Sequence, residues 1–273
     1  MKTIYLSSFC VDFRRYEMLE QLLYDCAEEG PLGVELATSW KYPEFDELLE
    51  AQIRRFRDIP VTIHAPFCET CTKKGSAEER FAWVQMEKAF RWYHLFGAGS
   101  MVMHTHSRAV REEEIPTLRQ RAEEVILETA EQCRREGIRL TVENVGHRAK
   151  GNVLYDQQAF IELFDRLPNE VGALIDTGHA MANGWEIPAV IEALGTRIRG
   201  YHLHNTDGVH DLHRPMYEPG WTHSPEQMDQ LIACIHRISP EADLILEYAP
   251  GPHICKALLS GELKRIRGIW DKG

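Results

Sequence analysis

The chain has 273 residues, of which 44% are hydrophobic, and its formal net charge at pH 7 is −11. This composition supplies a large core for one or two domains, and an α/β barrel of roughly 250 residues can form a single one. An acidic chain repels a nucleic-acid phosphate backbone, and the sequence has neither an apolar run of membrane-spanning length nor the pattern of a signal peptide, so we expect a cytoplasmic protein.

Short β-type runs alternate along the chain with longer runs whose apolar residues recur at helical spacing. The predicted strands are residues 3–9, 33–38, 61–66, 100–106, 138–145, 171–179, 198–205 and 242–250, and the predicted helices that follow them are residues 14–30, 42–58, 79–98, 116–137, 156–168, 186–197, 224–239 and 253–270. This alternation implies parallel strands joined by crossover helices. Eight such units predict an α/β fold, a closed (β/α)₈ TIM barrel that forms a single domain over residues 1–273. The alternative is a doubly wound open sheet, which would place a glycine-rich phosphate loop after the first strand, where the sequence reads SSFCVDF.

The seven cysteines are scattered from Cys10 to Cys255, so a disulfide framework is not expected. Cys68 and Cys71 form a CxxC motif that has no second pair nearby. We interpret them as two incidental thiols rather than as half of a zinc ribbon or a redox pair.

The ends of six consecutive predicted strands carry side chains that bind metals or transfer protons. In a barrel of this kind the active site lies at the C-terminal ends of the strands. In chain order these residues are His64, then His104 and His106, then Glu143, then Asp176 with His179 one turn on, then His202 and His204 followed by Asp211 and His213, and last Glu247. A single histidine at a strand end is more often structural than a ligand, but six such strands in succession are hard to assign to chance. Ionised groups at a barrel mouth are costly unless they are paired or bind a metal, so we predict a metal site.

Imidazole and carboxylate ligands together suit Zn²⁺, Mn²⁺, Fe²⁺ or Co²⁺. One ion needs about four to six ligands, and the larger number of candidates here would fit two or three ions, with a carboxylate such as Glu143 bridging. Closely spaced ions suit displacement at phosphorus, because they can bind the attacking and leaving oxygens. A single ion flanked by Glu143 and Glu247 suits proton transfer at the carbon beside a sugar carbonyl.

These motifs resemble the xylose isomerase-like TIM-barrel superfamily, which includes sugar isomerases and epimerases and the endonuclease IV group. The resemblance spans about residues 61–247 and rests on IHAP, VMHTH, VENVG, DTGHA, HLHN, DLHRP and LEY in this order. The resemblance to its sugar epimerases implies that Glu143, Asp176, His202 and Glu247 bind one divalent ion, and that the two glutamates exchange protons with the substrate. His204 would then contact substrate or support the ligands, and the two histidines exchange roles if the register shifts by two residues.

The endonuclease IV group carries three zinc ions, and its further ligands also have counterparts here. His64 and His104 correspond to its first site, and His179, Asp211 and His213 correspond to its third. The sequence departs from that group at VENVG, and its loops lack a cluster of basic and intercalating residues. The ligand match therefore leaves the reaction open.

Two further residues near the strand ends are candidates for contact with a substrate. His106 lies two residues after His104, so both face the same side of the strand. Glu35, near the end of the second predicted strand, could bind a hydroxyl group or be an ordinary carboxylate of the barrel mouth.

Loop residues supply three more candidates for contact with a substrate. Arg148 and Arg214 could hold a phosphate, although each is equally well explained as a solvated cation. Trp185 could stack on a sugar ring, although a tryptophan in a loop is as often a packing anchor.

The leading interpretation is a metal-dependent isomerase or epimerase that moves a proton between adjacent carbons of a sugar, polyol or sugar phosphate. The second is a multinuclear zinc phosphoester hydrolase, such as one acting at abasic sites in DNA, and the third is a non-catalytic metal or sugar binder. The cofactor would be Zn²⁺ or Mn²⁺, with one to three ions. We expect a small-molecule partner, no nucleic acid and no membrane, and a homodimer is compatible with the resemblance.

Overall fold

The computed structural model describes residues 1–38 and 44–271. Its eight strands form a closed parallel barrel in which each strand pairs with its neighbours in sequence and β8 closes onto β1. The strands are β1 (Ile4–Ser7), β2 (Leu32–Ala37), β3 (Val61–His64), β4 (Met101–His104), β5 (Leu140–Glu143), β6 (Gly172–Asp176), β7 (Ile198–Leu203) and β8 (Asp243–Leu246). This architecture confirms the predicted single-domain (β/α)₈ barrel.

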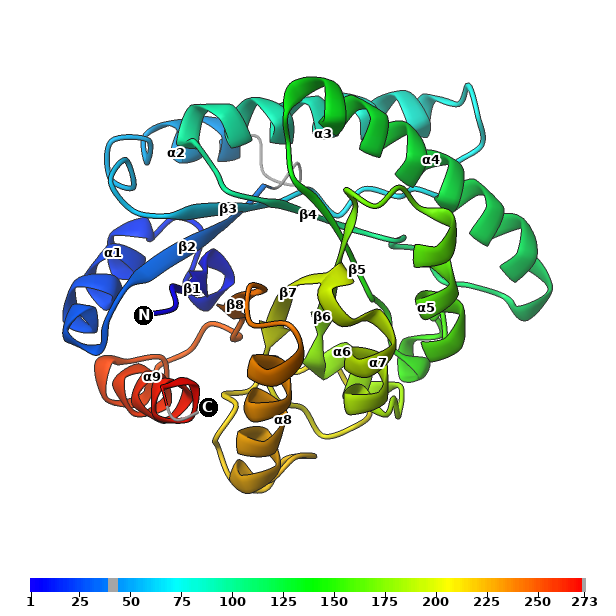
Figure 1. The fold of residues 1–273 in the computed structure, drawn as a ribbon. Coiled ribbons are helices and arrows are strands. Elements are labelled where there is room, and N and C mark those ends of the chain that lie inside the picture. Colours follow the sequence, from blue (N-terminus) through cyan, green and yellow to red (C-terminus); the bar gives the residue numbers. More distant parts are fainter. Residues whose placement is uncertain (39–43, 272–273) are drawn as a thin grey trace.

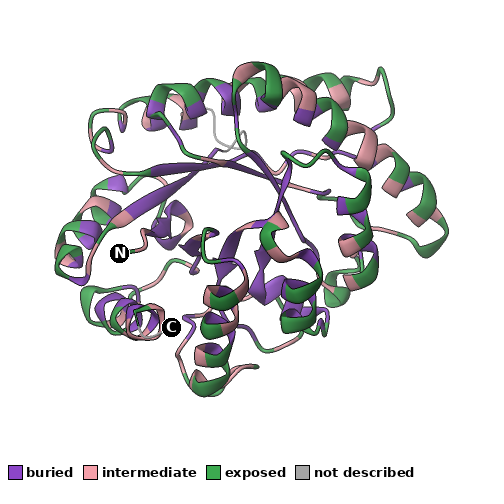
Figure 2. Ribbon diagram, viewed as in Figure 1, coloured by how far each residue is buried: buried purple, intermediate pink, exposed green. Residues whose placement is uncertain are grey.

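The helices surround the barrel, and the two ends of the chain lie near each other (Figure 1). They are α1 (Tyr16–Asp25), α2 (Phe45–Glu50), α3 (Ala77–Phe96), α4 (Ile115–Glu136), α5 (Gln157–Arg166), α6 (Thr177–Ala182), α7 (Ile187–Leu194), α8 (Pro225–Ile238) and α9 (Lys256–Trp270). Most strand residues are buried, and the helices turn their exposed faces outward (Figure 2). None of the helices in the described part of the chain combines the length and the apolar character that crossing a membrane requires.

Several observed elements are shorter than predicted, and two cases illustrate the difference. The predicted strand at residues 171–179 ends at Asp176, because the Asp176 carboxylate accepts a hydrogen bond from the backbone N–H of His179 and so caps helix α6. The helix predicted over residues 42–58 is shorter in the structure, because α2 ends at Glu50 and turns follow it. The first two residues of the predicted helix lie outside the described part of the chain.

Side-chain alternation along the strands sets the position of the site. Tyr5, Val102, Leu174 and Ile245 form a small cluster separate from the main core. Because side chains two residues apart lie on the same face of a strand, His104, Asp176 and Glu247 follow Val102, Leu174 and Ile245 on the same side. The apolar cluster therefore forms a layer beneath the polar groups at the strand ends.

Candidate metal centre

A cavity of about 570 Å³ lies at the C-terminal ends of the strands. Its polar side is formed by His64, His104, Glu143, His179, Asp211, His213 and Glu247. Asp176 and His202 are fully buried against these residues. The structure thus brings together all nine residues that were predicted as metal ligands.

The central group surrounds one nitrogen of His202. His202 Nδ1 lies 3.1 Å from Glu247 Oε2, 3.4 Å from Glu143 Oε1 and 3.8 Å from Asp176 Oδ2. Strand pairing fixes part of this arrangement, since Asp176 on β6 is the register partner of His202 on β7. Three carboxylates and an imidazole nitrogen therefore converge on one point.

A second group shares Glu143 with the first. His64 Nε2 and His104 Nε2 each lie 3.4 Å from Glu143 Oε2. The register again contributes, because His104 on β4 pairs with Glu143 on β5. Since the other oxygen of Glu143 faces His202, this carboxylate has the orientation of a bridging ligand.

The third group depends on the loop between β7 and α8. Asp211 Oδ2 lies 3.3 Å from His179 Nε2, and Asp211 Oδ1 lies 2.9 Å from His213 Nε2. Two backbone hydrogen bonds between Asn205 and Arg214 close the base of the loop. His213 has a φ of 46°, the only positive φ at a non-glycine position among the described residues, and such strain is concentrated at functional sites.

In four of the proposed ligand histidines, the ring nitrogen that points away from the cavity has a fixed acceptor. His64, His179 and His213 donate their Nδ1–H to the carbonyl oxygens of Ala65, Asn144 and Glu247, at 2.8, 3.0 and 3.0 Å. His202 donates its Nε2–H to the Glu35 carboxylate at 3.2 Å. In the neutral rings, the lone pair then lies on the nitrogen that faces the cavity, as metal coordination requires.

The electrostatics of the protein residues alone also fit a bound cation. Burial by itself lowers the pKa of His202, but the carboxylates of Glu247, Glu35 and Glu143 outweigh this effect and raise it well above the usual value. Burial likewise opposes the ionised form of Glu143, yet the neighbouring histidines hold its pKa well below the usual range. A divalent cation can take the place of the protons that these histidines would otherwise hold.

Some buried polar atoms of these groups have no hydrogen-bond partner. They are Glu143 Oε2, His202 Nδ1 and Asp211 Oδ1, one from each group. Unsatisfied buried atoms of this kind are costly, and a metal ion bound at each group would satisfy them. The donor set therefore fits one or more divalent ions.

Two predicted substrate contacts support the ligands instead of facing the cavity. Glu35 lies two residues before the end of β2, one layer deeper in the barrel, where it accepts the hydrogen bond from His202. His204 Nε2 lies 2.9 Å from Asp176 Oδ2, and the His204 ring stacks on His213 with centroids 4.1 Å apart. Each residue fixes the orientation of a proposed ligand.

His106 and Trp185 were also predicted to contact a substrate, but each contacts other parts of the protein. His106 is buried and donates its Nε2–H to the carbonyl oxygen of Asn152 at 2.6 Å. Trp185 belongs to the main hydrophobic core, and its ring centroid lies 5.6 Å from that of Phe160. Both positions agree with the structural alternatives, because each side chain is already satisfied within the protein.

The two predicted phosphate-binding arginines differ in their surroundings. Arg148 is exposed, and its backbone N–H donates to Asn183. The Arg214 guanidinium forms a bidentate ion pair with Glu218, at 2.8 and 3.0 Å, and lies over the ring of Trp221. Arg214 is therefore engaged by a carboxylate in this structure.

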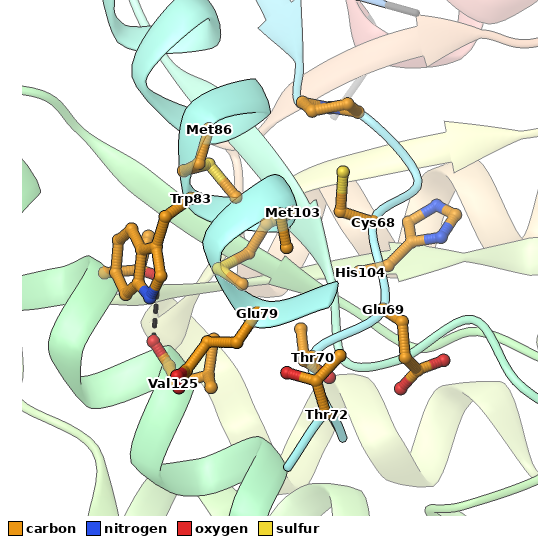
Figure 3. Close-up of a pocket in the computed structure, with 13 residues that line it drawn as sticks. Cys68, Glu69, Thr70, Thr72, Glu79, Trp83, Met86, Met103, His104 and Val125 are labelled. Carbon is orange, nitrogen blue, oxygen red and sulfur yellow. Dashed lines mark hydrogen bonds between the residues drawn. The ribbon is translucent and has the colours of Figure 1, made fainter. Parts of the chain in front are cut away.

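Cys68 of the CxxC motif lines a second, much smaller cavity of about 30 Å³, drawn in Figure 3 with Cys68 and His104 on its wall. Both cysteines are free and buried, and burial raises the pKa of each thiol to about 12. At neutral pH they stay protonated, which agrees with their interpretation as incidental thiols.

Aromatic residues on the loops after β1 and β3 also belong to the site but were not predicted. Phe9 and Phe67 stack with centroids 5.5 Å apart and line the cavity. Phe67 also lies 4.6 Å from the ring of His104. The signal available in the sequence was their position directly after a strand end, at SSF and at IHAPF.

Comparison with known proteins gives the family. The family model described as xylose isomerase-like TIM barrel matches residues 23–253. No curated protein matches the chain.

Solved structures that resemble the chain have low sequence identity and show a shared fold. A D-tagatose 3-epimerase-like protein has a TM-score of 0.74 and 17% identity, and the match covers 100% of this chain and 99% of the other. A protein from Thermus thermophilus, solved after soaking with ZnCl₂, has a TM-score of 0.72 and 18% identity over 100% and 99% of the chains. An AP endonuclease of family 2 from Brucella melitensis has a TM-score of 0.69 and 14% identity over 95% and 96%. On the evidence of the family match, with its eight-stranded barrel, the chain belongs to the xylose isomerase-like TIM-barrel family.

Proposed function

We propose that the protein is a divalent-metal-dependent isomerase or epimerase that moves a proton between adjacent carbons of a sugar, a polyol or a sugar phosphate. One observation carries the proposal. Two buried carboxylates, Glu143 and Glu247, converge on the same nitrogen of His202 at 3.4 and 3.1 Å, and both line the cavity. A substrate held between them would present its carbon-bound hydrogen to a carboxylate on either side.

Glu143, Asp176, His202 and Glu247 would hold the central ion. When bound, such an ion polarises a carbonyl group and an adjacent hydroxyl group. Glu143 and Glu247 act as the acid/base pair, one taking the proton from carbon and the other returning it. Without a metal ion, His202 outweighs the cost of burial and lowers the pKa of both glutamates, and a bound cation would favour their ionised, proton-accepting form in the same way.

The test is a screen of ketoses and their phosphates in D₂O, in the presence of Mn²⁺ or Zn²⁺, with deuterium incorporation at carbon followed by NMR. We expect Glu143→Gln and Glu247→Gln each to lower turnover by about 10²-fold or more, the usual contribution of an acid/base group. His64→Ala and His213→Ala should be tolerated better. Glu113→Gln, whose side chain is 71% exposed, is the control and should leave turnover unchanged. If both glutamine variants turn over at the wild-type rate, the proposed roles are wrong.

The second candidate is hydrolysis of a phosphoester by a multinuclear centre, and a specific observation favours it. Beyond the central group, His64 with His104 and His179 with His213 are each arranged around a shared carboxylate. Because a hydrolase would use every ion, all four of Glu143→Gln, Glu247→Gln, His64→Ala and His213→Ala should abolish it. An identified hydrolytic activity that survives both histidine substitutions would rule out a three-metal mechanism.

A non-catalytic binder is the third candidate. It would show affinity for a sugar with no turnover, whichever metal is supplied.

A further inference from the structure

Part of the cavity lining forms an apolar wall. It includes the aromatic rings of Phe9, Phe13, Tyr16, Phe45 and Phe67, together with Val11. The ligand groups come from β3 to β8 and the loops after them, whereas most of this wall comes from the segment that follows β1 and from the start of α2. The cavity lining therefore combines a part rich in carboxylates and imidazoles with a part rich in aromatic side chains, where Asp12 and Arg14 also lie.

The apolar wall is an ordered assembly of rings. Phe9 and Phe67 stack at 5.5 Å, and Phe13 lies 5.9 Å from Phe45. Phe67 contacts the His104 ring at 4.6 Å, so the apolar wall begins directly beside the proposed ligands. The cavity, at about 570 Å³, is of the size that accepts small organic ligands and has room beyond the ligand groups.

The described residues that line the cavity carry more carboxylates than lysine or arginine side chains. Among the described residues that line the cavity, Arg14 is the one lysine or arginine. Its guanidinium lies 2.9 Å from the Glu44 carboxylate and 4.1 Å from the centroid of Phe13. The same lining carries four carboxylates, those of Asp12, Glu143, Asp211 and Glu247.

From this arrangement we infer that the substrate is uncharged and has two unlike ends, an oxygen-bearing end that reaches the ligand groups and an apolar end that packs on the aromatic wall. The inference rests on the proposed function and narrows its substrate class, because it favours a deoxy or alkyl-bearing polyol over a sugar phosphate. If the reacting oxygens lie at the carboxylate side, the far end of the substrate lies against the rings. Among the described residues that line the cavity, a phosphate placed there would meet no lysine or arginine other than Arg14, which is paired with Glu44, so the loss of its hydration would be strongly unfavourable.

The test uses hydroxamates, whose two adjacent oxygens chelate divalent ions whatever the substrate is. The probes are acetohydroxamate, butanohydroxamate, hexanohydroxamate and the phosphate-bearing phosphoglycolohydroxamate. Binding to the Mn²⁺-loaded protein is measured by titration calorimetry, after metal content has been measured by elemental analysis. The affinity of each probe for free Mn²⁺ supplies the baseline.

We expect the dissociation constant to fall by up to roughly fourfold for each methylene group added, the factor for removing one methylene from water. Phosphoglycolohydroxamate should bind more weakly than acetohydroxamate. Phe67→Ala and Phe13→Ala should reduce the dependence of affinity on chain length. Phe81 lies on the outer side of the barrel in α3 and is 45% exposed, so Phe81→Ala should leave this dependence unchanged. The wild-type series decides the question even if an aromatic variant fails to fold.

The outcomes separate the two proposals. Affinities that do not depend on chain length, or tightest binding of the phosphate-bearing probe, would overturn the inferred substrate class and leave metal-dependent proton transfer standing. If none of the hydroxamates binds to protein that carries its full metal content, both proposals fail.

Discussion

Glu143 connects the ligand groups at the scale of single residues, because its two oxygens face different histidines. The sequence indicated this role through the position of Glu143 at the end of a predicted strand. The sequence did not indicate how Glu35 acts, since a glutamate near a strand end can face the cavity or lie one layer beneath it. Depth in the barrel is decided by the stagger of neighbouring strands, which a single sequence does not display.

Substitution Glu35→Gln tests the support that this residue gives to His202. Glutamine keeps the size of the side chain but removes the charge that orients the imidazole, so we expect metal affinity to fall by about 10- to 100-fold. The measurement is competition for the metal with a chelator of known affinity. The exposed Glu113→Gln serves as control, and an unchanged affinity in Glu35→Gln would show that the hydrogen bond does not support metal binding.

Gly178 is a second position at which the surrounding structure limits the size of the side chain. A Cβ built at Gly178 would overlap the ring of His204, which bonds to Asp176. We expect Gly178→Ala to lower the free energy of unfolding by about 1–3 kcal/mol, the usual cost of overpacking. In the matched control Gly261→Ala, in the exposed part of α9, nothing lies within 4 Å of the added Cβ, and we expect a gain of about 0.5–1 kcal/mol. Urea denaturation measures both, and equal effects would contradict the close approach.

At the scale of elements, the last helix is tied to the loop that carries the third ligand group. Glu262 of α9 is 3% exposed and accepts hydrogen bonds from the Tyr248 hydroxyl and, at 3.2 Å, from the Tyr217 backbone N–H. Tyr248 follows Glu247 directly, and Tyr217 lies in the loop after β7. The sequence predicted the helix and the strand end, but not that a buried carboxyl group would join them.

The protonation of Glu262 predicts a pH dependence of stability. Burial raises the pKa of Glu262 to about 7, although its hydrogen bonds favour the ionised form. The folded protein therefore binds this proton more tightly than the unfolded chain does, and the resulting stabilisation is complete below the unfolded pKa and is lost as the pH rises through about 7.

Glu262→Gln cannot ionise, so its free energy of unfolding relative to wild type should rise by about 2 kcal/mol between pH 5 and pH 8. Urea titrations at the two pH values measure the difference, with Glu113→Gln as the control. A difference that is the same at both pH values would show that Glu262 does not titrate in this range.

The order of the elements was predictable because each strand and helix follows from local periodicity. The shape of the loop after β7 was not predictable, because it depends on the Asn205–Arg214 bridge and on the strained backbone of His213. Neither feature has a periodic pattern in the sequence. The direction of the Trp185 side chain was not predictable either, since an aromatic residue in a loop can face the cavity or the core. The aromatic wall was missed because its members come from loops and helix starts, whose folding is set by tertiary contacts.

At the scale of the whole molecule, the barrel gathers the proposed ligands from β3 to β8 and the loops after them at one mouth, and aromatic side chains line part of the same cavity. The acidic chain and this small, two-sided cavity support a small-molecule substrate. A homodimer stays a prediction, as does the cytoplasmic location.

The most direct test of the central claim is the metal content of untagged protein purified without chelator, measured by elemental mass spectrometry. The account predicts at least one zinc, manganese or cobalt ion per chain, and a clear loss of that ion in Glu143→Gln. Two or three zinc ions would favour the hydrolytic candidate, and a single ion would favour proton transfer. Protein that contains no divalent ion, and takes up none on dialysis against Zn²⁺ or Mn²⁺, would contradict the account.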